Sequence, residues 1–312
     1  MTPLKNRFDA YEQMLRLHQP AGVLLLLWPV LSALWLATGG RPPLSLVIIF
    51  VMGTLLMRSV GCALGDWLDH NKGRNNGGSD RGDGQRTADN RAGLLERGVI
   101  APWEALAVAV VLTLIAFGFI WFTTRIAIGI AAVALVSALA LALVQLFYRR
   151  FVSLSRVFFG IAFLFGIPLA FAAANNTVPW YAWGLMGVHV FWIVAYDIEY
   201  AMARRDKDIE RDRRSSALIL GRYDVLATAV SYGLYLAGMV GVGLWWRLGI
   251  AYGVALALAT ACAVGCLWLA HSRKTSHCFA AFRCNHWIGV VIFIGVVADY
   301  ALRLHSWPML GR

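Results

Sequence analysis

Long runs of apolar residues alternate along this chain with mostly short polar connections. Nine runs can be delimited, each long enough for a helix that crosses a hydrocarbon core of roughly 30 Å. They are residues 20–38, 45–64, 102–123, 126–147, 157–174, 180–200, 224–246, 248–270 and 285–303. Short connections favour antiparallel packing of neighbouring helices. The pattern predicts an all-α, polytopic membrane bundle of nine transmembrane helices, forming a single domain over residues 1–312.

Composition and the placement of charge support a membrane protein. Only 14% of the 312 residues are charged, whereas a soluble domain carries about a quarter. With the N-terminus in the cytoplasm, 22 of the 28 Lys and Arg fall in cytoplasmic segments and five fall outside, with Arg58 inside a run. This asymmetry predicts a cytoplasmic N-terminus and a periplasmic C-terminus. The basic charge therefore indicates topology in a lipid bilayer and not a nucleic-acid partner.

Two connections are long and polar, residues 65–101 and 201–223, and both are cytoplasmic in this topology. Twelve of the 17 Asp and Glu lie at or beside them, six at 66–96 and six at 197–212. The positive-inside rule accounts for Lys and Arg in such loops, but it places no acidic residues there. These segments are therefore the first candidates for a functional site.

The acidic segments have the chemistry of a magnesium–phosphate site. Asp66 and Asp69 are three residues apart, so a continuing helix would present both on one face. Mg²⁺ takes one or two carboxylates and fills its remaining positions with water or phosphate oxygens, and Arg side chains match phosphate oxygens. Beside an apolar bundle, this combination suggests a diphosphate with a lipid tail. The alternative is a solvated loop whose mixed charges only keep it soluble. The acidic side chains of the second segment are Asp197, Glu199, Asp206 and Asp208.

Several stretches resemble one family collinearly: "LMRSVGCALGDWLDH" (56–70), "RTADNR" (86–91), "WIVAYDIEYAMARRDKD" (192–208) and "SSALILGRYD" (215–224). They are similar to the UbiA superfamily of intramembrane prenyltransferases, most closely to bacterial 4-hydroxybenzoate polyprenyltransferases. The resemblance implies a UbiA-type fold in the bacterial inner membrane. It implies Mg²⁺-dependent transfer of a polyprenyl group from polyprenyl diphosphate to 4-hydroxybenzoate, at the ring carbon ortho to the hydroxyl, in ubiquinone biosynthesis.

The resemblance also implies roles for individual residues. The catalytic carboxylates would be Asp66, Asp69, Asp197 and Asp208. The metal would be held by Asp66, Asp69, Asp206 and Asp208, with Asp83 as a further candidate. The diphosphate would meet Arg86, Arg91, Arg205 and Lys207. The acceptor would meet Arg58, Arg149 and Arg150; an arginine within a membrane span, as Arg58 is, is costly and usually functional.

The chain departs from the family pattern at three positions. Gly65 stands where the first motif, Asn-Asp-x-x-Asp-x-x-x-Asp, has its Asn, and Gly73 falls on its third Asp. A different gap placement makes Asp83 the third carboxylate. In the second motif, Asp-x-x-x-Asp, Arg204 occupies the first Asp position. We expect weaker Mg²⁺ binding as a result, which leaves open a relative with another aromatic acceptor or with weakened or lost activity.

Two further expectations concern the membrane spans. A transporter would place its charges near the bilayer midplane at broken helices, whereas these acidic clusters lie at the cytoplasmic margin, so the pattern favours an enzyme. Asp299 lies near the outer end of the last run, where an exposed carboxylate costs little, and we expect it to have no role.

Overall fold

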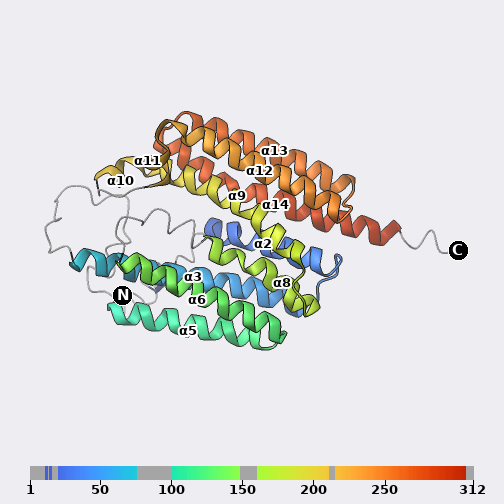
Figure 1. Ribbon diagram of the computed structural model, residues 1–312, viewed down its shortest axis with the longest axis horizontal. Helices are drawn as coiled ribbons and strands as arrows, with labels where there is room; N and C mark the ends of the chain where they lie inside the picture. The colour runs from blue at the N-terminus through green and yellow to red at the C-terminus, as the bar shows by residue number, and fades with distance from the viewer. Residues whose placement is uncertain are drawn as a thin grey trace, which may run out of the picture.

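The computed structural model describes residues 11–12, 14–15, 20–75, 100–147, 160–210 and 215–306. Within these ranges, the side chains of residues 20, 21, 68–75, 141–147, 207, 210 and 304–306 are outside the description. All secondary structure in the described part is helical, which confirms the predicted all-α class. Figure 1 shows the helices running roughly along one axis.

The first half of the described chain includes α2 (Pro20–Ala37), α3 (Leu44–Asn75), α5 (Pro102–Trp121), α6 (Arg125–Phe147) and α8 (Gly166–Asn175). The second half begins with α9 (Trp180–Ala203), followed by the short helices α10 (Arg205–Glu210) and α11 (Ser216–Leu220). The 3₁₀ turn η2 (Gly221–Tyr223) leads into α12 (Asp224–Trp245), α13 (Ile250–His271) and α14 (Thr275–Ser306). Every predicted apolar run coincides at least in part with one of these helices.

Six apolar helical stretches in the described part are long enough to cross a membrane by length and composition. They are Leu44–Trp67, Pro102–Trp121, Trp180–Ala203, Ser216–Trp245, Ile250–His271 and Thr275–Arg303. Three further apolar helices are shorter in the described residues, namely Gly22–Ala37, Arg125–Ala140 and Gly160–Asn175. Multiple membrane helices are thus confirmed, and the count of nine spans stays a prediction.

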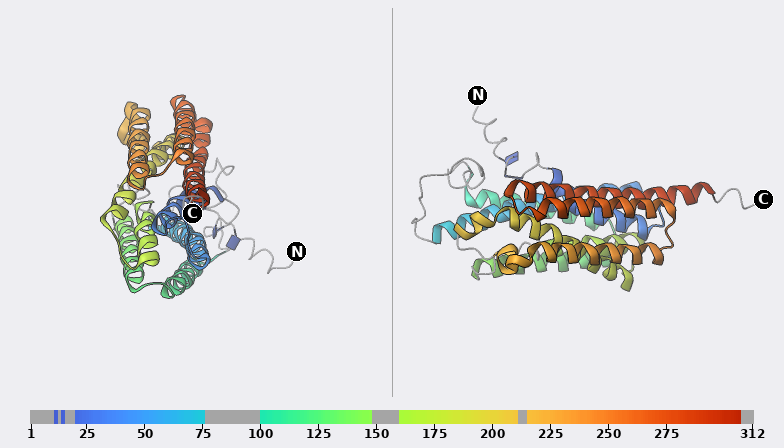
Figure 2. Two further views of the ribbon diagram at one scale, coloured as in Figure 1. Left: turned by 90° about the vertical axis from the view of Figure 1, so that its right-hand side faces the viewer. Right: turned by 90° about the horizontal axis from the view of Figure 1, so that it is seen from above.

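The helices form two groups on either side of α2 and α8. On one side α3 packs along α5, and on the other α13 packs along α14 and α9 along α12. Helix α2 contacts α3, α8 and α14, so it joins the two groups. The end-on view in Figure 2 places the α3–α5 side and the α12–α13–α14 side at opposite ends of the cross-section. The short helices α10 and α11 lie at one end of the bundle, called here the α10 end (Figure 1).

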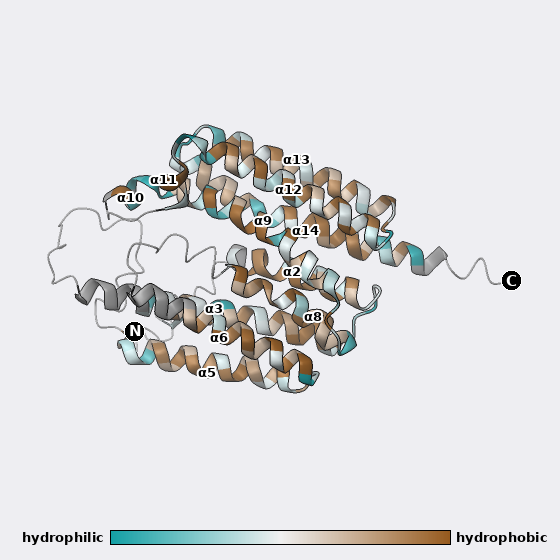
Figure 3. Ribbon diagram, in the orientation of Figure 1, coloured by the Kyte–Doolittle hydropathy of each residue, from teal (hydrophilic) through white to brown (hydrophobic). Residues whose placement is uncertain are grey.

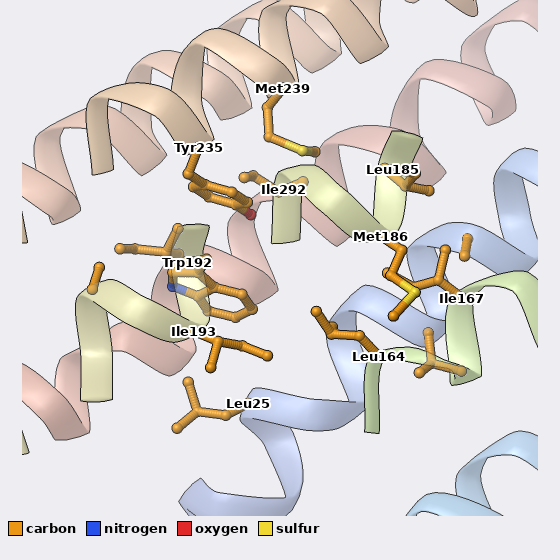
Figure 4. Packing of buried hydrophobic residues seen from close by; sticks show 14 of the residues in the cluster. Leu25, Leu164, Ile167, Leu185, Met186, Trp192, Ile193, Tyr235, Met239 and Ile292 are labelled. Carbon is orange, nitrogen blue, oxygen red and sulfur yellow. The ribbon is translucent and has the colours of Figure 1, made fainter. Parts of the chain in front are cut away.

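The surface and the interior are both apolar, as expected for a bundle solvated by lipid. Figure 3 shows hydrophobic residues along the helix lengths and hydrophilic ones mainly near the ends. Large side chains such as Ile250 and Trp268 are 87% and 77% exposed, a pattern that water would disfavour. Inside, Trp192 of α9 stacks on Tyr235 of α12 with ring centroids 5.6 Å apart, surrounded by aliphatic side chains including Ile292 of α14 (Figure 4).

Asp299 of α14 corrects one sequence-based expectation, because it is buried, with 4% of its surface exposed. Its Oδ1 accepts a hydrogen bond from the Gly249 backbone N–H at 2.6 Å, just before α13 begins. Its Oδ2 lies 2.7 Å from Nε of Arg303, one turn further along α14. The carboxylate therefore ties two helices together, at the end of the bundle opposite α10.

Candidate active site

Four of the predicted site carboxylates stand near the α10 end. Asp66 lies in the carboxyl-terminal part of α3, and Asp197 lies two turns before the end of α9. Asp206 and Asp208 belong to α10, which follows α9 almost directly. The final turns of α3 and α9 both approach this end of the bundle (Figure 1). Asp206 is exposed and Asp66 half-buried, while Asp197 and Asp208 are 7% and 2% exposed. The fold thus brings both acidic segments to one end.

Asp197 is held by a residue that the sequence reasoning did not single out. Oγ of Ser216, the first residue of α11, donates a hydrogen bond to Oδ2 of Asp197 at 3.0 Å. This contact fixes α11 against the last turns of α9. The serine belongs to the "SSALILGRYD" stretch, so the resemblance pointed to the segment but not to this contact. Asp197 is therefore oriented by a second element of the same end.

The helix breaks at Arg204, between α9 and α10. Its backbone leaves the helical region (φ −115°, ψ 9°), and its carbonyl then accepts the Asp208 N–H at 2.9 Å as α10 begins. The Arg204 side chain folds back along α9: Nη1 donates to the Tyr200 hydroxyl at 2.8 Å. The guanidinium carbon also lies 5.6 Å from the Tyr200 ring centroid, within cation–π range. This is the cation that the family resemblance places at the first Asp position of the second motif.

Arg205 makes contacts that its predicted role as a diphosphate ligand did not anticipate. Its Nη2 lies 2.7 Å from Oδ2 of Asp224, a carboxylate with no exposed surface at the start of α12. The same nitrogen donates to the carbonyls of Ala217 and Gly221 at 2.8 and 3.2 Å. In this structure, the guanidinium therefore links α10 to α11, η2 and α12.

Glu199 lies apart from the other acidic residues of its segment, in a buried polar network between three helices. It has no exposed surface. Its carboxylate accepts hydrogen bonds from the Tyr232 hydroxyl of α12 at 2.9 Å and from Nδ2 of Asn285 of α14 at 2.6 Å. Trp192 Nε1 donates to Oδ1 of the same Asn285 at 3.0 Å. Nothing in the local sequence distinguishes Glu199 from a site carboxylate, because its partners are 33 and 86 residues away.

Arg58, the predicted acceptor ligand within a span, lies in α3 about two turns before Asp66. Its side chain is half-buried and packs against Gly22 of α2, where an added Cβ would come 2.7 Å from Arg58 Nη2. Its Nη1 also contacts the sulfur of Cys62 one turn later. A glycine at position 22 is thus what allows the guanidinium to lie between α3 and α2. Its role toward an acceptor stays a prediction.

The remaining predicted residues are only partly described. Asp69 and Lys207 fall within α3 and α10, but their side chains lie outside the described part, and five others lie outside it altogether: Asp83, Arg86, Arg91, Arg149 and Arg150. Among the side chains that are described, no group of three or more His, Cys, Asp or Glu is close enough to hold a metal ion. The metal-ligand predictions therefore stay predictions.

The fold and this end of the bundle define a class of protein: a membrane-embedded helical bundle that brings the carboxylates of separate helices to one end. A model of the UbiA prenyltransferase family matches residues 26–289. The chain belongs to the UbiA prenyltransferase family.

Similar proteins extend over nearly the whole chain. A 4-hydroxybenzoate octaprenyltransferase of Janthinobacterium sp. (strain Marseille) is 43% identical over 299 residues, which cover 96% of this chain and all of the relative. One from Burkholderia cenocepacia (strain HI2424) is 44% identical, covering 95% and 98% of the two chains.

Solved structures show the same fold at low sequence identity. A UbiA homolog from Aeropyrum pernix K1 superposes with a TM-score of 0.67 at 18% identity, covering 88% of this chain and 97% of that one. A UbiA homolog from Archaeoglobus fulgidus, bound to GPP and Mg²⁺, has a TM-score of 0.66 at 13% identity, covering 93% and 99%. The UbiA-type fold is therefore established for this chain.

Proposed function

We propose that this protein transfers a polyprenyl group from polyprenyl diphosphate to the ring carbon ortho to the hydroxyl of 4-hydroxybenzoate, in an Mg²⁺-dependent step of ubiquinone biosynthesis. The observation that carries the proposal is the 43–44% identity to 4-hydroxybenzoate octaprenyltransferases over almost the full length of both chains. The gathering of Asp66, Asp197, Asp206 and Asp208 at one end of an apolar bundle supports it.

The residues at the α10 end fit Mg²⁺ by the chemistry of their donors. Magnesium prefers carboxylate oxygens and needs only one or two of them, because water and phosphate oxygens complete its shell. Asp66 and Asp69 on α3 would hold it on one side, and Asp206 and Asp208 on α10 on the other, with Asp83 as a further candidate. When bound there, the ion would neutralise charge on the diphosphate as it leaves.

The protein side chains bind and orient the two substrates. Arg86, Arg91 and Lys207 would contact the diphosphate oxygens, since cationic donors bind phosphate strongly. Asp197, held by Ser216, would orient this end of α9. Arg58, with Arg149 and Arg150, would pair with the carboxylate of 4-hydroxybenzoate. The aromatic ring would then form a carbon–carbon bond to the allylic carbon as the bond to diphosphate breaks, and the ring would lose a proton. Apolar helices exclude water, which protects the reactive allylic group from hydrolysis.

The topology belongs to the same proposal. We infer nine membrane spans in one domain over residues 1–312, with the N-terminus in the cytoplasm, the C-terminus in the periplasm, and the polar segments 65–101 and 201–223 as a cytoplasmic cap. The protein would reside in the bacterial inner membrane. The distribution of Lys and Arg supports this orientation.

The direct test is an assay of membranes containing the protein with polyprenyl diphosphate, 4-hydroxybenzoate and Mg²⁺. We expect prenylated 4-hydroxybenzoate, and a loss of about 10–100-fold or more in Asp66→Ala and in Asp208→Ala, by analogy with other metal sites. Asp299→Asn, at the opposite end of the bundle, is the control and should keep its activity per folded protein.

Three outcomes would contradict the proposal in different ways. A folded protein that makes no product would exclude the reaction. Product that survives both aspartate substitutions unchanged would exclude the proposed site. Product with a different aromatic acid, and none with 4-hydroxybenzoate, would keep the reaction and change the acceptor.

A further inference from the structure

Three charged side chains meet at a buried point of the α10 end, and we call them the Asp224 ion-pair cluster: Arg205, Asp224 and Arg273. Asp224 has no exposed surface. Its Oδ2 lies 2.7 Å from Nη2 of Arg205, and its Oδ1 lies 2.7 Å from Nη2 of Arg273. Oδ1 also accepts the Val225 backbone N–H at 2.7 Å. One buried carboxylate therefore holds two guanidiniums, each through its own oxygen.

The cluster joins segments that are distant in the sequence. Arg205 is the first residue of α10, and it also binds the carbonyls of Ala217 and Gly221. Arg273 lies in the turn between α13 and α14, with a left-handed backbone (φ 53°), and its Nη2 donates to the Arg222 carbonyl at 2.8 Å. Through Asp224, at the start of α12, the cluster fixes α10 relative to three longer helices.

Helix α10 depends on such contacts for its position. It has six residues, and helices shorter than about 12–15 residues are marginal in isolation. Asp206 and Asp208, two of the proposed metal-binding carboxylates, lie one and three residues after Arg205 in this helix. The orientation of Arg205 therefore sets where these two carboxylates stand at the α10 end.

We propose that the Asp224 ion-pair cluster positions the α10 carboxylates for the divalent metal, with Arg205 and Asp224 as positioning residues and Arg205 not bound to the diphosphate. This inference rests on the proposed function, because it takes Asp206 and Asp208 as metal-binding groups. A substitution at Asp224 can distinguish the two possible roles of Arg205, which are binding the diphosphate and positioning α10. The buried Asp224 carboxylate cannot contact a diphosphate, but it can control the position of the helix that carries the metal ligands.

The decisive variant is Asp224→Asn, compared with Arg205→Gln. The matched control is Asp299→Asn, which removes another buried carboxylate paired with an arginine, 75 residues further on. The first measurement is binding of Mn²⁺, which shares the oxygen ligands of Mg²⁺, to the purified folded protein with inorganic diphosphate present. The second is the Mg²⁺ concentration that gives half-maximal prenyl transfer.

We expect Asp224→Asn and Arg205→Gln each to weaken Mn²⁺ binding by about 10–100-fold, as substitutions behind metal ligands commonly do. Turnover of Asp224→Asn should be largely restored at high Mg²⁺. A merely structural defect would instead reduce the amount of folded protein without moving the Mg²⁺ half-saturation point, and this is the behaviour expected of Asp299→Asn.

Arg273→Gln keeps the inference testable if Asp224→Asn does not fold, because it removes only the outer of the two ion pairs. We expect it to weaken Mn²⁺ binding several-fold. Unchanged Mn²⁺ binding in folded Asp224→Asn and Arg273→Gln would overturn the inference. So would a rise in KM for the prenyl diphosphate, without any change in Mn²⁺ binding, that is confined to Arg205→Gln. A wild-type protein that makes no product while the variants still lose Mn²⁺ would overturn the proposed reaction and support the positioning role.

Discussion

Glu199 provides a sharp test of what holds α9 in place. We compare Glu199→Leu with Glu199→Gln, which differ in whether hydrogen bonding is kept. In the glutamine variant, the side-chain carbonyl would accept from Nδ2 of Asn285 and the amide would donate to the Tyr232 oxygen. The Tyr232 hydroxyl could then donate to Oδ1 of Asn285, which already lies 2.8 Å away. Every group of the network would keep a partner although the carboxylate is gone.

The leucine variant leaves one donor without a partner. The Tyr232 hydroxyl can still turn to Oδ1 of Asn285, but Nδ2 of Asn285 keeps only the Ala281 carbonyl at 3.1 Å, so one buried N–H is left over. An unsatisfied buried donor costs about 1–3 kcal/mol, whereas hydrogen bonds measured within bilayers average about 0.6 kcal/mol. We therefore expect Glu199→Leu to lower the free energy of unfolding by about 1–2 kcal/mol, and Glu199→Gln by less than about 0.5 kcal/mol.

The measurement is reversible unfolding of the purified protein in mixed micelles as the denaturing detergent is titrated. Prenyl transfer is assayed on the same preparations. Because Glu199 is enclosed by α12 and α14, the glutamine variant should also retain its activity. If Glu199→Gln destabilises the protein as much as Glu199→Leu, the charge matters and the hydrogen-bond argument is refuted. If glutamine abolishes product while leaving stability unchanged, Glu199 acts in the reaction itself.

Two other substitutions test packing and the metal site. In Gly289→Ala, the new Cβ would lie 2.9 Å from atoms of both Trp28 and Trp192, so we expect a loss of about 1–3 kcal/mol in unfolding free energy. Gly253→Ala, where an added Cβ meets nothing within 4 Å, is the control and should be neutral or stabilising by up to about 1 kcal/mol. Arg204→Asp should raise prenyl transfer at limiting Mg²⁺, because it places a carboxylate where the family resemblance expects the first Asp of the second motif; unchanged activity would mean that Arg204 has its own role or lies outside the site.

The helices could be predicted from the sequence, because an apolar run of membrane length has few possible structures other than a membrane-spanning helix. The ends of the helices could not be predicted in this way. The run predicted at 285–303 belongs to a helix that begins ten residues earlier, at Thr275. Likewise, the run at 45–64 continues as α3 to Asn75. In both cases the helix extends past its apolar stretch into polar sequence. Hydropathy delimits what lies in hydrocarbon, whereas a helix continues as long as its own hydrogen bonds and neighbouring contacts stabilise it.

The acidic segment after residue 196 shows the corresponding limit for the site. The sequence identified a concentration of carboxylates, and the fold brings Asp197 and Asp208 to the expected end. The sequence did not show that Glu199, two residues after Asp197, has a different role. Side chains two residues apart on a helix point in nearly opposite directions, so only one of the two can face the site. Which direction faces other helices is decided by partners on α12 and α14.

Asp224 and Glu199 illustrate how one bundle end can hold carboxylates together against their mutual repulsion. The helices that carry the proposed ligands are also held by carboxylates outside the proposed ligand set. Within the span, α9 is anchored by Glu199 through uncharged donors on α12 and α14. Beyond the span, where the six-residue α10 buries little apolar surface, two guanidiniums on Asp224 do the same. Removing Asp224 would leave Arg205 and Arg273, which are 27% and 43% exposed and so partly solvated, without the carboxylate that joins α10 to α12 and to the turn between α13 and α14. Loss of Asp224 should therefore affect α10 more strongly than loss of Glu199 affects α9.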